Sequence, residues 1–361
     1  MEVHLQQLCQ HLKDKVELEV IVANHCDGGR FESLDGVRVQ RLAASATIAG
    51  APICLSLPRA IWQAKADIVH VHLPHPTAIL AYLACGAPGN LICTYHSDIV
   101  RQQLLGSFIA PLQEVAFRRA KAIIATSPNL LAGSRVLMSH RERCVVVPLG
   151  IQHAIYESPH SQRASELREI FRAPIILTVG RLVYYKGFSH LIQAMAHLQE
   201  RAVLLIIGDG PLRGVLAEEI EKLNLTGRVH LIGDVPDIIP YYQACDIFVL
   251  PSIARSEAFG LVQLEAMACA KPVINTEIEG SGVPFVSIHG KTGLTVPPAD
   301  ATALANAMDH LLRDEPLGVQ LGQAGRQRVR DEFTLRKMAD RTLKIYQSIF
   351  SKRSVSNGGQ R

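Results

Sequence analysis

Short runs of apolar, often β-branched residues alternate with longer amphipathic stretches along the whole chain, and this alternation constrains the fold most strongly. Apolar runs separated by helical lengths indicate parallel strands that are covered by helices on both faces. Because right-handed crossovers connect such strands, each series predicts an open doubly wound sheet. The runs form two series, and the predicted strands are Leu18–Ala23, Val37–Leu42, Asp67–His72, Leu91–Tyr95, Ala122–Thr126 and Cys144–Val147, followed by Ile175–Val179, Val203–Ile207, Val229–Ile232, Ile247–Leu250, Pro272–Asn275 and Gly293–Val296.

A length of 361 residues suits two α/β domains. The first series ends at Pro148–His153, and a polar stretch follows it, so we expect an N-terminal domain over residues 1–153 and a C-terminal domain over 154–340. Helical periodicity over Leu335–Phe350 predicts a last helix, and the Ser/Gly/Arg-rich end of the segment 341–361 predicts a frayed tail.

Charge and composition exclude several classes of protein. The 37 Lys and Arg residues exceed the 33 Asp and Glu residues by only +4, and no basic block carries interleaved aromatics, so nucleic acid is not an expected partner. The segment Asp98–Arg143 is locally basic. It is interpreted either as a solvated helix face or as a contact with an anionic membrane or an acidic acceptor.

Cysteine usage and the absence of targeting signals indicate a cytoplasmic protein. The 8 cysteines are scattered and form no C-x-x-C pair, which predicts free thiols in a reducing compartment. The first residues lack the cationic start and apolar core of a signal peptide, and no apolar stretch is long enough to span a membrane.

A turn after the first strand of the second series carries two cations. Gly180 ends the predicted strand, and Arg181 and Lys186 follow before a helix. Two cations at the carboxyl end of a strand can neutralise a diphosphate, with Arg supplying a fork of donors and Lys a point charge. The alternative is two surface cations near a turn.

A second motif follows the predicted strand Ile247–Leu250. Glu257 lies in a loop, and Gly260 opens a helix whose free backbone N–H groups, at Gly260 and Leu261, suit a phosphate oxygen. Glu265, further along that helix, can accept hydrogen bonds from a ribose diol, while Glu257 can meet sugar hydroxyls. The alternative makes Glu257 a helix-end charge and Glu265 an exposed helical residue.

Three other strand ends carry weaker signals. Gly208 begins a Gly-Asp-Gly-Pro turn, and the backbone of Val235 follows the next strand, where it can read a base edge. His96 follows the strand Leu91–Tyr95 and is a candidate polar contact or proton carrier, or else a structural histidine. His70 and His72 share a strand face, but no nearby carboxylate or thiolate completes a convincing metal site.

Metal chemistry is not expected at the phosphate site either. No Asp-x-Asp occurs in the chain, whereas transferases that hold nucleotide-sugar phosphates through a divalent metal often carry closely spaced carboxylates. Arg181, Lys186 and a helix dipole would neutralise the phosphates instead.

Taken together, these motifs resemble the retaining GT-B glycosyltransferases of family 4. The resemblance rests on G-R-L-x-x-x-K-G from Gly180, on G-D-G-P, on S-E-A-F-G-L-V-x-L-E-A-M-A from Ser256, on K-P-V-I and on the segment Gly290–Val296. It extends from the first residues to about Arg341. The run from His96 to Arg101 is similar to a subgroup that builds bacterial surface polysaccharides, including O-antigen mannosyltransferases.

The resemblance implies a GT-B fold, in which two Rossmann-like domains face a cleft and the last helix returns to the N-terminal domain. It implies that Arg181 and Lys186 hold the diphosphate and that Glu265 binds the ribose. It also implies that Glu257, with Phe259, Gly260 and Leu261, contacts the sugar and the phosphates, and that His96 lies near the reacting carbon. Gly180, Gly208 and Val235 are further expected donor contacts, and Asp98 and Arg101 are expected acceptor contacts.

The resemblance also implies a strand and a Gly-Gly loop before the first helix, with the pattern G-G-x-E. Met1-Glu2 falls where that pattern ends, so we expect the first strand of the N-terminal sheet to be missing from the sequence given, through a misassigned start codon or a truncation. The loss of a central strand would leave unpaired ladder groups in its neighbours.

The sequence thus predicts a metal-independent, retaining enzyme that moves a hexose, with mannose as the candidate, from a GDP- or UDP-sugar to a glycan or lipid-linked acceptor. No cofactor is expected, since the nucleotide-sugar is a substrate. A peripheral contact with an anionic membrane is a further expectation. The alternatives are a nucleotide-sugar 2-epimerase and an inactive nucleotide-sugar-binding fragment.

Overall fold

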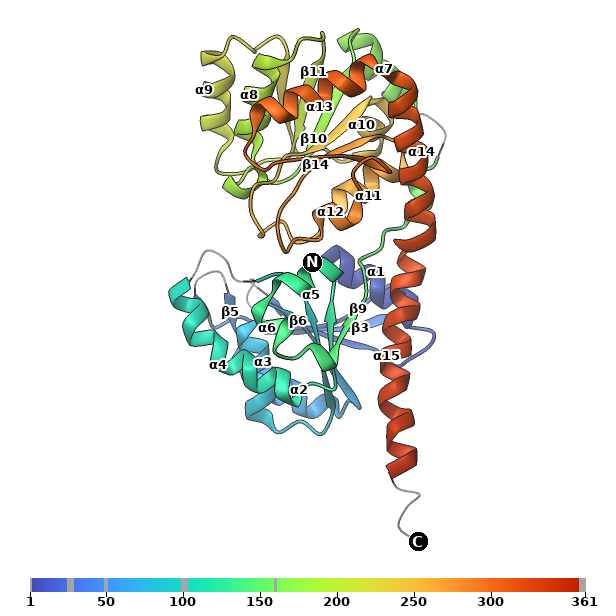
Figure 1. Ribbon diagram of the computed structural model, residues 1–361. Coiled ribbons are helices and arrows are strands. Elements are labelled where there is room, and N and C mark those ends of the chain that lie inside the picture. Colours follow the sequence, from blue (N-terminus) through green and yellow to red (C-terminus); the bar gives the residue numbers. More distant parts are fainter. Residues whose placement is uncertain (1, 25–28, 49–50, 99–102, 159–160, 357–361) are drawn as a thin grey trace. The chain divides into compact units, whose positions relative to one another are not determined.

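The computed structural model describes residues 2–24, 29–48, 51–98, 103–158 and 161–356 (Figure 1). The chain forms two compact units. Unit 1 combines Met1–Thr126, Ser134–Pro148 and Leu335–Arg361, whereas unit 2 combines Ser127–Gly133 and Leu149–Thr334. Both are discontinuous in sequence, because Ser127–Gly133 belongs to unit 2 and the chain returns to unit 1 with its last helix.

Unit 2 is built on one parallel sheet of six strands in the order β12-β11-β10-β13-β14-β15. The residues of β10, β11, β13 and β14 are almost entirely buried, as expected for a parallel sheet with both faces covered. The strand bounds are β10 Ile175–Val179, β11 Val203–Ile207, β12 Val229–Gly233, β13 Ile247–Leu250, β14 Val273–Thr276 and β15 Gly293–Val296.

Helices cover both faces of this sheet (Figure 1). On one face, α8, α9 and α13 enclose a hydrophobic core with alternate residues of the strands, because their apolar residues recur at helical spacing. The side chains of Asp300 and Asp314 cap the starts of α13 and α14. The helices of unit 2 are α5 Pro128–Gly133, α7 Gln162–Phe171, α8 Phe188–His197, α9 Arg213–Lys222, α10 Ile239–Ala244, α11 Leu261–Ala268, α12 Val283–Val286, α13 Ala301–Arg313 and α14 Glu315–Glu332, with short 3₁₀ turns η2 His153–Ile155 and η3 Tyr184–Lys186.

The strand order places a topological switch point between β10 and β13. The chain starts at β10, moves outward through β11 and β12, and then crosses back to β13 on the other side of β10. At such a point the loops after neighbouring strands run in opposite directions and leave a crevice that binds ligands in open α/β sheets. The loops after β10 and β13 carry the two motifs found in the sequence.

Unit 1 contains several small sheets rather than the single doubly wound sheet predicted. Its strands form a sheet β1-β3-β2, a parallel sheet β6-β7-β8-β9 and a hairpin β4-β5. Within the described residues β1 pairs only with β3 and β6 pairs only with β7, and the apolar residues Val20–Ala23 of β1 stay half-buried. The strands are β1 Glu19–Asn24, β2 Arg30–Leu34, β3 Val37–Ala43, β4 Ala46–Ile48, β5 Ala51–Ile53, β6 Ile68–Leu73, β7 Asn90–Tyr95, β8 Ala122–Ala125 and β9 Cys144–Val146.

The helices of unit 1 come from both ends of the chain. The last helix, α15, packs against the first, α1, and Lys15 forms an ion pair with Asp340 at 2.7 Å (Figure 1). The helices are α1 Glu2–Leu12, α2 Leu57–Ala64, α3 Pro76–Cys85, α4 Gln103–Arg119, α6 Arg135–Met138 and α15 Leu335–Ser356, with the 3₁₀ turn η1 Arg141–Arg143. None of the helices in the described ranges is long and apolar enough to cross a membrane.

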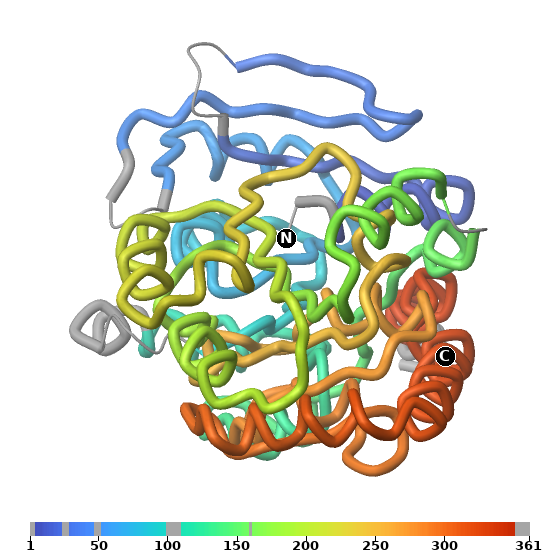
Figure 2. Tube along the Cα trace, turned by 90° about the horizontal axis from the view of Figure 1, so that it is seen from above, coloured from blue at the N-terminus to red at the C-terminus, as the bar shows by residue number. Residues whose placement is uncertain are grey.

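The twelve predicted strands are confirmed, with ends that shift by no more than a residue or so. The sequence did not predict β2, β4 and β5. Figure 2 shows β2 and β3, in blue, running side by side as a long hairpin. Most of the side chains of β2 are exposed, so this strand has no apolar run from which it could be recognised.

Candidate active site

A buried ion pair joins the two sequence motifs of unit 2. Lys186 Nζ lies 2.6 Å from Glu257 Oε2, and the two side chains are only 10% and 11% exposed. Ser252, two residues after the end of β13, donates a hydrogen bond to the same carboxylate at 3.0 Å. The interpretation of Lys186 as a surface cation is therefore wrong, and Glu257 is held by specific contacts.

Glycines let the backbone pack closely beside this pair. A Cβ on Gly208, which has φ +123°, would lie 2.2 Å from the Gly180 carbonyl oxygen, and a Cβ on Gly180 would lie about 3 Å from the end of the Lys186 side chain. Only glycine permits this approach of β10 and β11 at their carboxyl ends. The Lys186 ammonium consequently lies against bare backbone.

The loop after β13 ends at a helix start that is fixed by a buried amide network. Gly260 adopts φ +74° and precedes Leu261, the first residue of α11, while Phe259 is buried. Gln263 donates to the Phe259 carbonyl oxygen, and Asn275 donates to Gln263 Oε1 at 2.9 Å. Neither Gln263 nor Asn275 was predicted as a site residue. Each could be recognised in the sequence only as a polar residue inside an otherwise apolar helix or strand.

Glu265 lies one turn further along α11 and is bound by a tyrosine. The Tyr242 hydroxyl donates to Glu265 Oε2 at 2.7 Å. Burial raises the pKa of the Glu265 carboxyl, while hydrogen bonds from Tyr242 and Tyr156 and the charge of Lys186 act in the opposite direction. The interpretation of Glu265 as an exposed helical residue is therefore wrong, and neither tyrosine was predicted as its partner.

The remaining predicted donor residues surround this centre less tightly. Arg181 is exposed and forms no ion pair with any residue in the described ranges. Its charge reaches the Tyr185 hydroxyl, whose pKa is raised chiefly by burial. Val235 is half-buried, follows the end of β12 and makes no described side-chain contact with the ion pair.

In unit 1, His96 lies directly after β7 and belongs to a group of four histidines. Its Nε2 is 3.0 Å from Nδ1 of His72, and the two rings are stacked with centroids 5.3 Å apart. His70 stacks on His72, and the ring of His4 meets His72 and His96 edge-on. Burial, followed by the neighbouring histidines, holds the pKa of His96 well below its ordinary value.

Asp98 and Arg101 are the two residues expected to contact the acceptor. Asp98 accepts hydrogen bonds from the Tyr95 and Ser134 hydroxyls, both at 2.7 Å, and so ties β7 to the start of α6. Arg101 lies outside the described residues.

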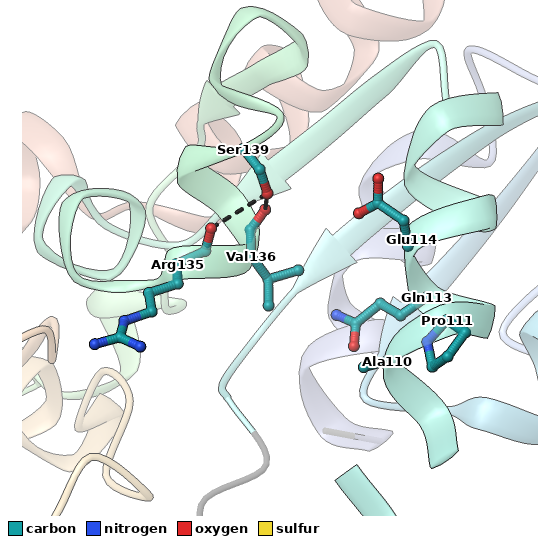
Figure 3. A pocket seen from close by; sticks show the side chains of 7 residues that line it. All are labelled: Ala110, Pro111, Gln113, Glu114, Arg135, Val136 and Ser139. Carbon is teal, nitrogen blue, oxygen red and sulfur yellow. Dashed lines mark hydrogen bonds between the residues drawn. The ribbon is translucent and has the colours of Figure 1, made fainter. Parts of the chain in front are cut away.

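The described residues show no metal-binding cluster at this site, and a hollow in unit 1 lies away from the predicted site residues. In the described part of the chain, no group of three or more His, Cys, Asp or Glu side chains is placed to hold a metal ion. A hollow of about 410 Å³ lies between α4 and α6 and is lined by Gln113, Glu114 and Arg135, among others (Figure 3). None of the sequence-predicted site residues lines it.

Comparison with known proteins assigns the chain to a family. Residues 1–154 match the family described as Glycosyltransferase Family 4, and residues 165–328 match Glycosyl transferases group 1. The O-antigen chain mannosyltransferase C of Escherichia coli is 34% identical over 312 residues, which span 85% of this chain and 82% of that protein. The chain belongs to glycosyltransferase family 4. This family 4 enzyme therefore transfers a sugar from a nucleotide-sugar.

Two other proteins extend the comparison. The D-rhamnosyltransferase WbpZ of Pseudomonas aeruginosa is 36% identical over 273 residues, 75% of this chain and 71% of that protein. The structure of a sucrose-phosphate synthase from Thermosynechococcus elongatus superposes with a TM-score of 0.82 at 26% identity and covers 97% of this chain and 93% of that one. The family 4 enzyme thus has the GT-B fold, with a parallel sheet in each unit.

The buried histidines predict that the enzyme loses stability in acid. Burial lowers the pKa of His4 from 6.5 to about 4 and that of His72 to about 3. Below pH 6.5 the unfolded chain therefore binds more protons than the folded chain, and each such histidine costs up to about 1.4 kcal/mol per pH unit. We expect the melting temperature to be lower at pH 5.5 than at pH 7.5.

The substitution His4→Gln removes one of these groups, so we expect it to reduce that fall. The substitution His197→Gln, at an exposed position of α8, is the control and should leave the fall unchanged. A melting temperature that is the same at both pH values would contradict the prediction.

Proposed function

We propose that this glycosyltransferase moves a hexose, with mannose as the candidate, from a GDP- or UDP-sugar to a glycan or lipid-linked acceptor in surface-polysaccharide synthesis. Two relatives above 30% identity support the choice, since one is named as an O-antigen mannosyltransferase and the other as a D-rhamnosyltransferase. D-Rhamnose is mannose without its 6-hydroxyl, so the two names share one sugar configuration.

The buried Lys186–Glu257 pair at the switch point is the observation that carries the proposal. An ammonium between bare glycine backbone and a helix start offers a diphosphate a cation and free N–H groups within a site of low dielectric. Arg181 supplies the second cation from its exposed position. Glu257 then meets sugar hydroxyls, Glu265 binds the ribose, and the strand ends at Gly208 and Val235 border the nucleotide.

Transfer proceeds with retention of the anomeric configuration and without a metal ion. A carboxylate that is bound to both Lys186 and Ser252 is a poor nucleophile, because its charge is already compensated. We therefore assign Glu257 to binding rather than to a covalent step. The departing diphosphate, stabilised by Arg181 and Lys186, accepts the proton of the acceptor hydroxyl.

His96 is the proposed contribution of unit 1 to the transferred sugar. Its low pKa keeps the imidazole neutral at neutral pH, so that it can accept or donate a hydrogen bond to a sugar hydroxyl. Asp98 and Arg101 remain proposed acceptor-side residues, and the hydrogen bonds of Asp98 to Tyr95 and Ser134 favour a positioning role for it.

The substitution Glu257→Gln tests the donor site. The amide can still accept hydrogen bonds from Ser252 and Lys186 but carries no negative charge. We therefore expect kcat to fall at least about 100-fold while the protein stays folded. Sugar transfer is measured with each nucleotide-sugar against a lipid-linked acceptor, and folding is measured by circular dichroism. Glu257→Ala is less suitable, because it also removes the hydrogen-bond acceptor that Gln keeps for Ser252 and Lys186.

Glu218→Gln on α9 is the matched control, since that side chain is 72% exposed, and it should leave turnover unchanged. Unchanged turnover in Glu257→Gln would refute the role of Glu257. A changed sugar in the donor alone, without an acceptor, would instead indicate an epimerase, and binding without transfer would indicate an inactive protein.

The substitution Arg181→Gln tests the diphosphate contact. We expect the Kd for a nucleoside diphosphate to rise about 10-fold by calorimetry, while the Kd for the nucleoside without phosphates stays the same. Lys222→Gln, at an exposed position of α9, is the control for loss of a positive charge. Equal losses for nucleoside and nucleoside diphosphate would contradict a phosphate contact.

We also propose that the enzyme reaches its acceptor at an anionic membrane surface through a basic face of unit 1. This face comprises exposed cations from the end of α4 to η1, together with exposed apolar side chains, and we define it by Arg118, Arg119, Lys121, Arg135, Arg141, Val115 and Met138. Each basic residue near such a surface contributes about 1 kcal/mol of attraction.

The double substitution Arg119→Glu/Lys121→Glu tests this face. We expect the parent enzyme to float with phosphatidylglycerol vesicles and not with phosphatidylcholine vesicles, and the double variant to stay at the bottom of the gradient. Arg201→Glu/Lys222→Glu in unit 2 is the charge-matched control and should float like the parent. A parent enzyme that does not float would dismiss the membrane contact.

A further inference from the structure

The register of β6 against β7 brings two histidines into hydrogen-bonding contact. The strands pair in parallel with His72 opposite Thr94. The backbone N–H of His96 donates to the Leu73 carbonyl oxygen at 3.0 Å. Because alternate residues of a strand share a face, His72 and His96 project on the same side. This places Nδ1 of His72 and Nε2 of His96 3.0 Å apart.

The described side chains that contact this pair are imidazoles and the groups bonded to them are hydroxyls. The ring nitrogens of His70 bond to the Tyr346 hydroxyl of α15 and to the Thr94 hydroxyl, both at 2.7 Å, and the ring of His4 on α1 meets the pair edge-on. In the described ranges no carboxylate forms an ion pair with any of these histidines. The pair therefore has no counter-ion that would favour an imidazolium.

Two neutral imidazoles in a hydrogen bond must divide their roles, since one nitrogen donates and the other accepts. The bond fixes the tautomers of both rings together and holds the ring plane of His96. Nδ1 of His96 makes no hydrogen bond to any described residue, so it is the nitrogen left to a ligand.

We propose that His72 is a positioning residue for His96, whose Nδ1 contact fixes the tautomer and orientation in which His96 presents its Nδ1 to the sugar. The inference rests on the proposed role of His96 in transfer. His72 itself touches no substrate and acts only through the neighbouring ring.

Two substitutions of His72 separate this role from a merely structural one. Asn carries its amide where the histidine carries Nδ1, so His72→Asn keeps a partner for His96, whereas His72→Leu fills a similar volume without one. We expect His72→Leu to lower kcat 10- to 100-fold with KM for the nucleotide-sugar within 2-fold, and His72→Asn to stay within 5-fold of the parent. If Asn performs no better than Leu, or if Leu retains the parent kcat, the proposal is overturned.

Two further variants test the route through His96. In a His96→Ala background, we expect His72→Leu to lower kcat by less than a further 2-fold, because a positioning residue has nothing left to position. Tyr346→Phe removes the hydrogen bond to His70 alone, so it is the packing control and should leave kcat within 2-fold. Additive losses in the double variant would overturn the proposal.

A readout without turnover distinguishes failure of this inference from failure of the proposed function. Long-range ¹H–¹⁵N spectra report which ring nitrogen carries the proton, and we expect a single fixed tautomer for His96 in the parent and in His72→Asn but a mixture in His72→Leu. Unchanged His96 shifts in His72→Leu would overturn the inference even in an active enzyme. A parent that transfers no sugar but shows these shifts would instead refute the proposed function alone.

Discussion

A lysine and a glutamate, both largely out of reach of water, join the ends of two neighbouring strands in unit 2. Burying either charge alone is costly, so the loop after β10 and the loop after β13 are stable only when Lys186 and Glu257 meet. Ser252 donates to the same carboxylate, and the lack of a side chain at Gly180 leaves room for the end of the Lys186 side chain. The site thereby offers an ammonium group to a phosphate and a carboxylate to a sugar hydroxyl.

The buried polar side chains around His96 in unit 1 are stabilised in a different way. His96 lies among three other imidazoles, and no carboxylate in the described ranges forms an ion pair with any of the four rings. His72 bonds to His96 and His70 bonds to the Tyr346 and Thr94 hydroxyls, whereas Nδ1 of His4 has no hydrogen-bond partner among the described residues. Burial and mutual repulsion keep such rings uncharged at neutral pH. One unit therefore presents fixed charge, and the other presents neutral donors and acceptors whose directions depend on their neighbours.

The sequence predicted most of the fold because buried parallel strands leave a strong apolar signal. Every strand of unit 2 has such a run, and the polar residues that follow β10 and β13 marked the candidate site before the structure was known. Strand β2 was missed because its side chains face solvent, and the division of the unit 1 strands into small sheets was missed because an apolar run does not identify its neighbours.

The supporting residues of the site were beyond prediction for a related reason. Tyr242 of α10 donates a hydrogen bond to Glu265 of α11, and Asn275 of β14 donates one to Gln263 of α11. The roles of these residues therefore depend on contacts between segments that are separate in the sequence. The pairing of His72 with His96 likewise needs the register of β6 and β7, which composition does not encode. A motif thus identifies the groups that meet a ligand more readily than those that orient them.

The return of the chain to unit 1 through α15 has a consequence for the order in which the molecule is made. A ribosome delivers all the strands of unit 1 and all those of unit 2 before it delivers Leu335–Ser356. Until that last helix emerges, α1 lacks its packing partner and His70 lacks the Tyr346 hydroxyl. A polypeptide cut short before Leu335 would retain the buried ion pair of unit 2 yet leave unit 1, which is made first, without its last helix.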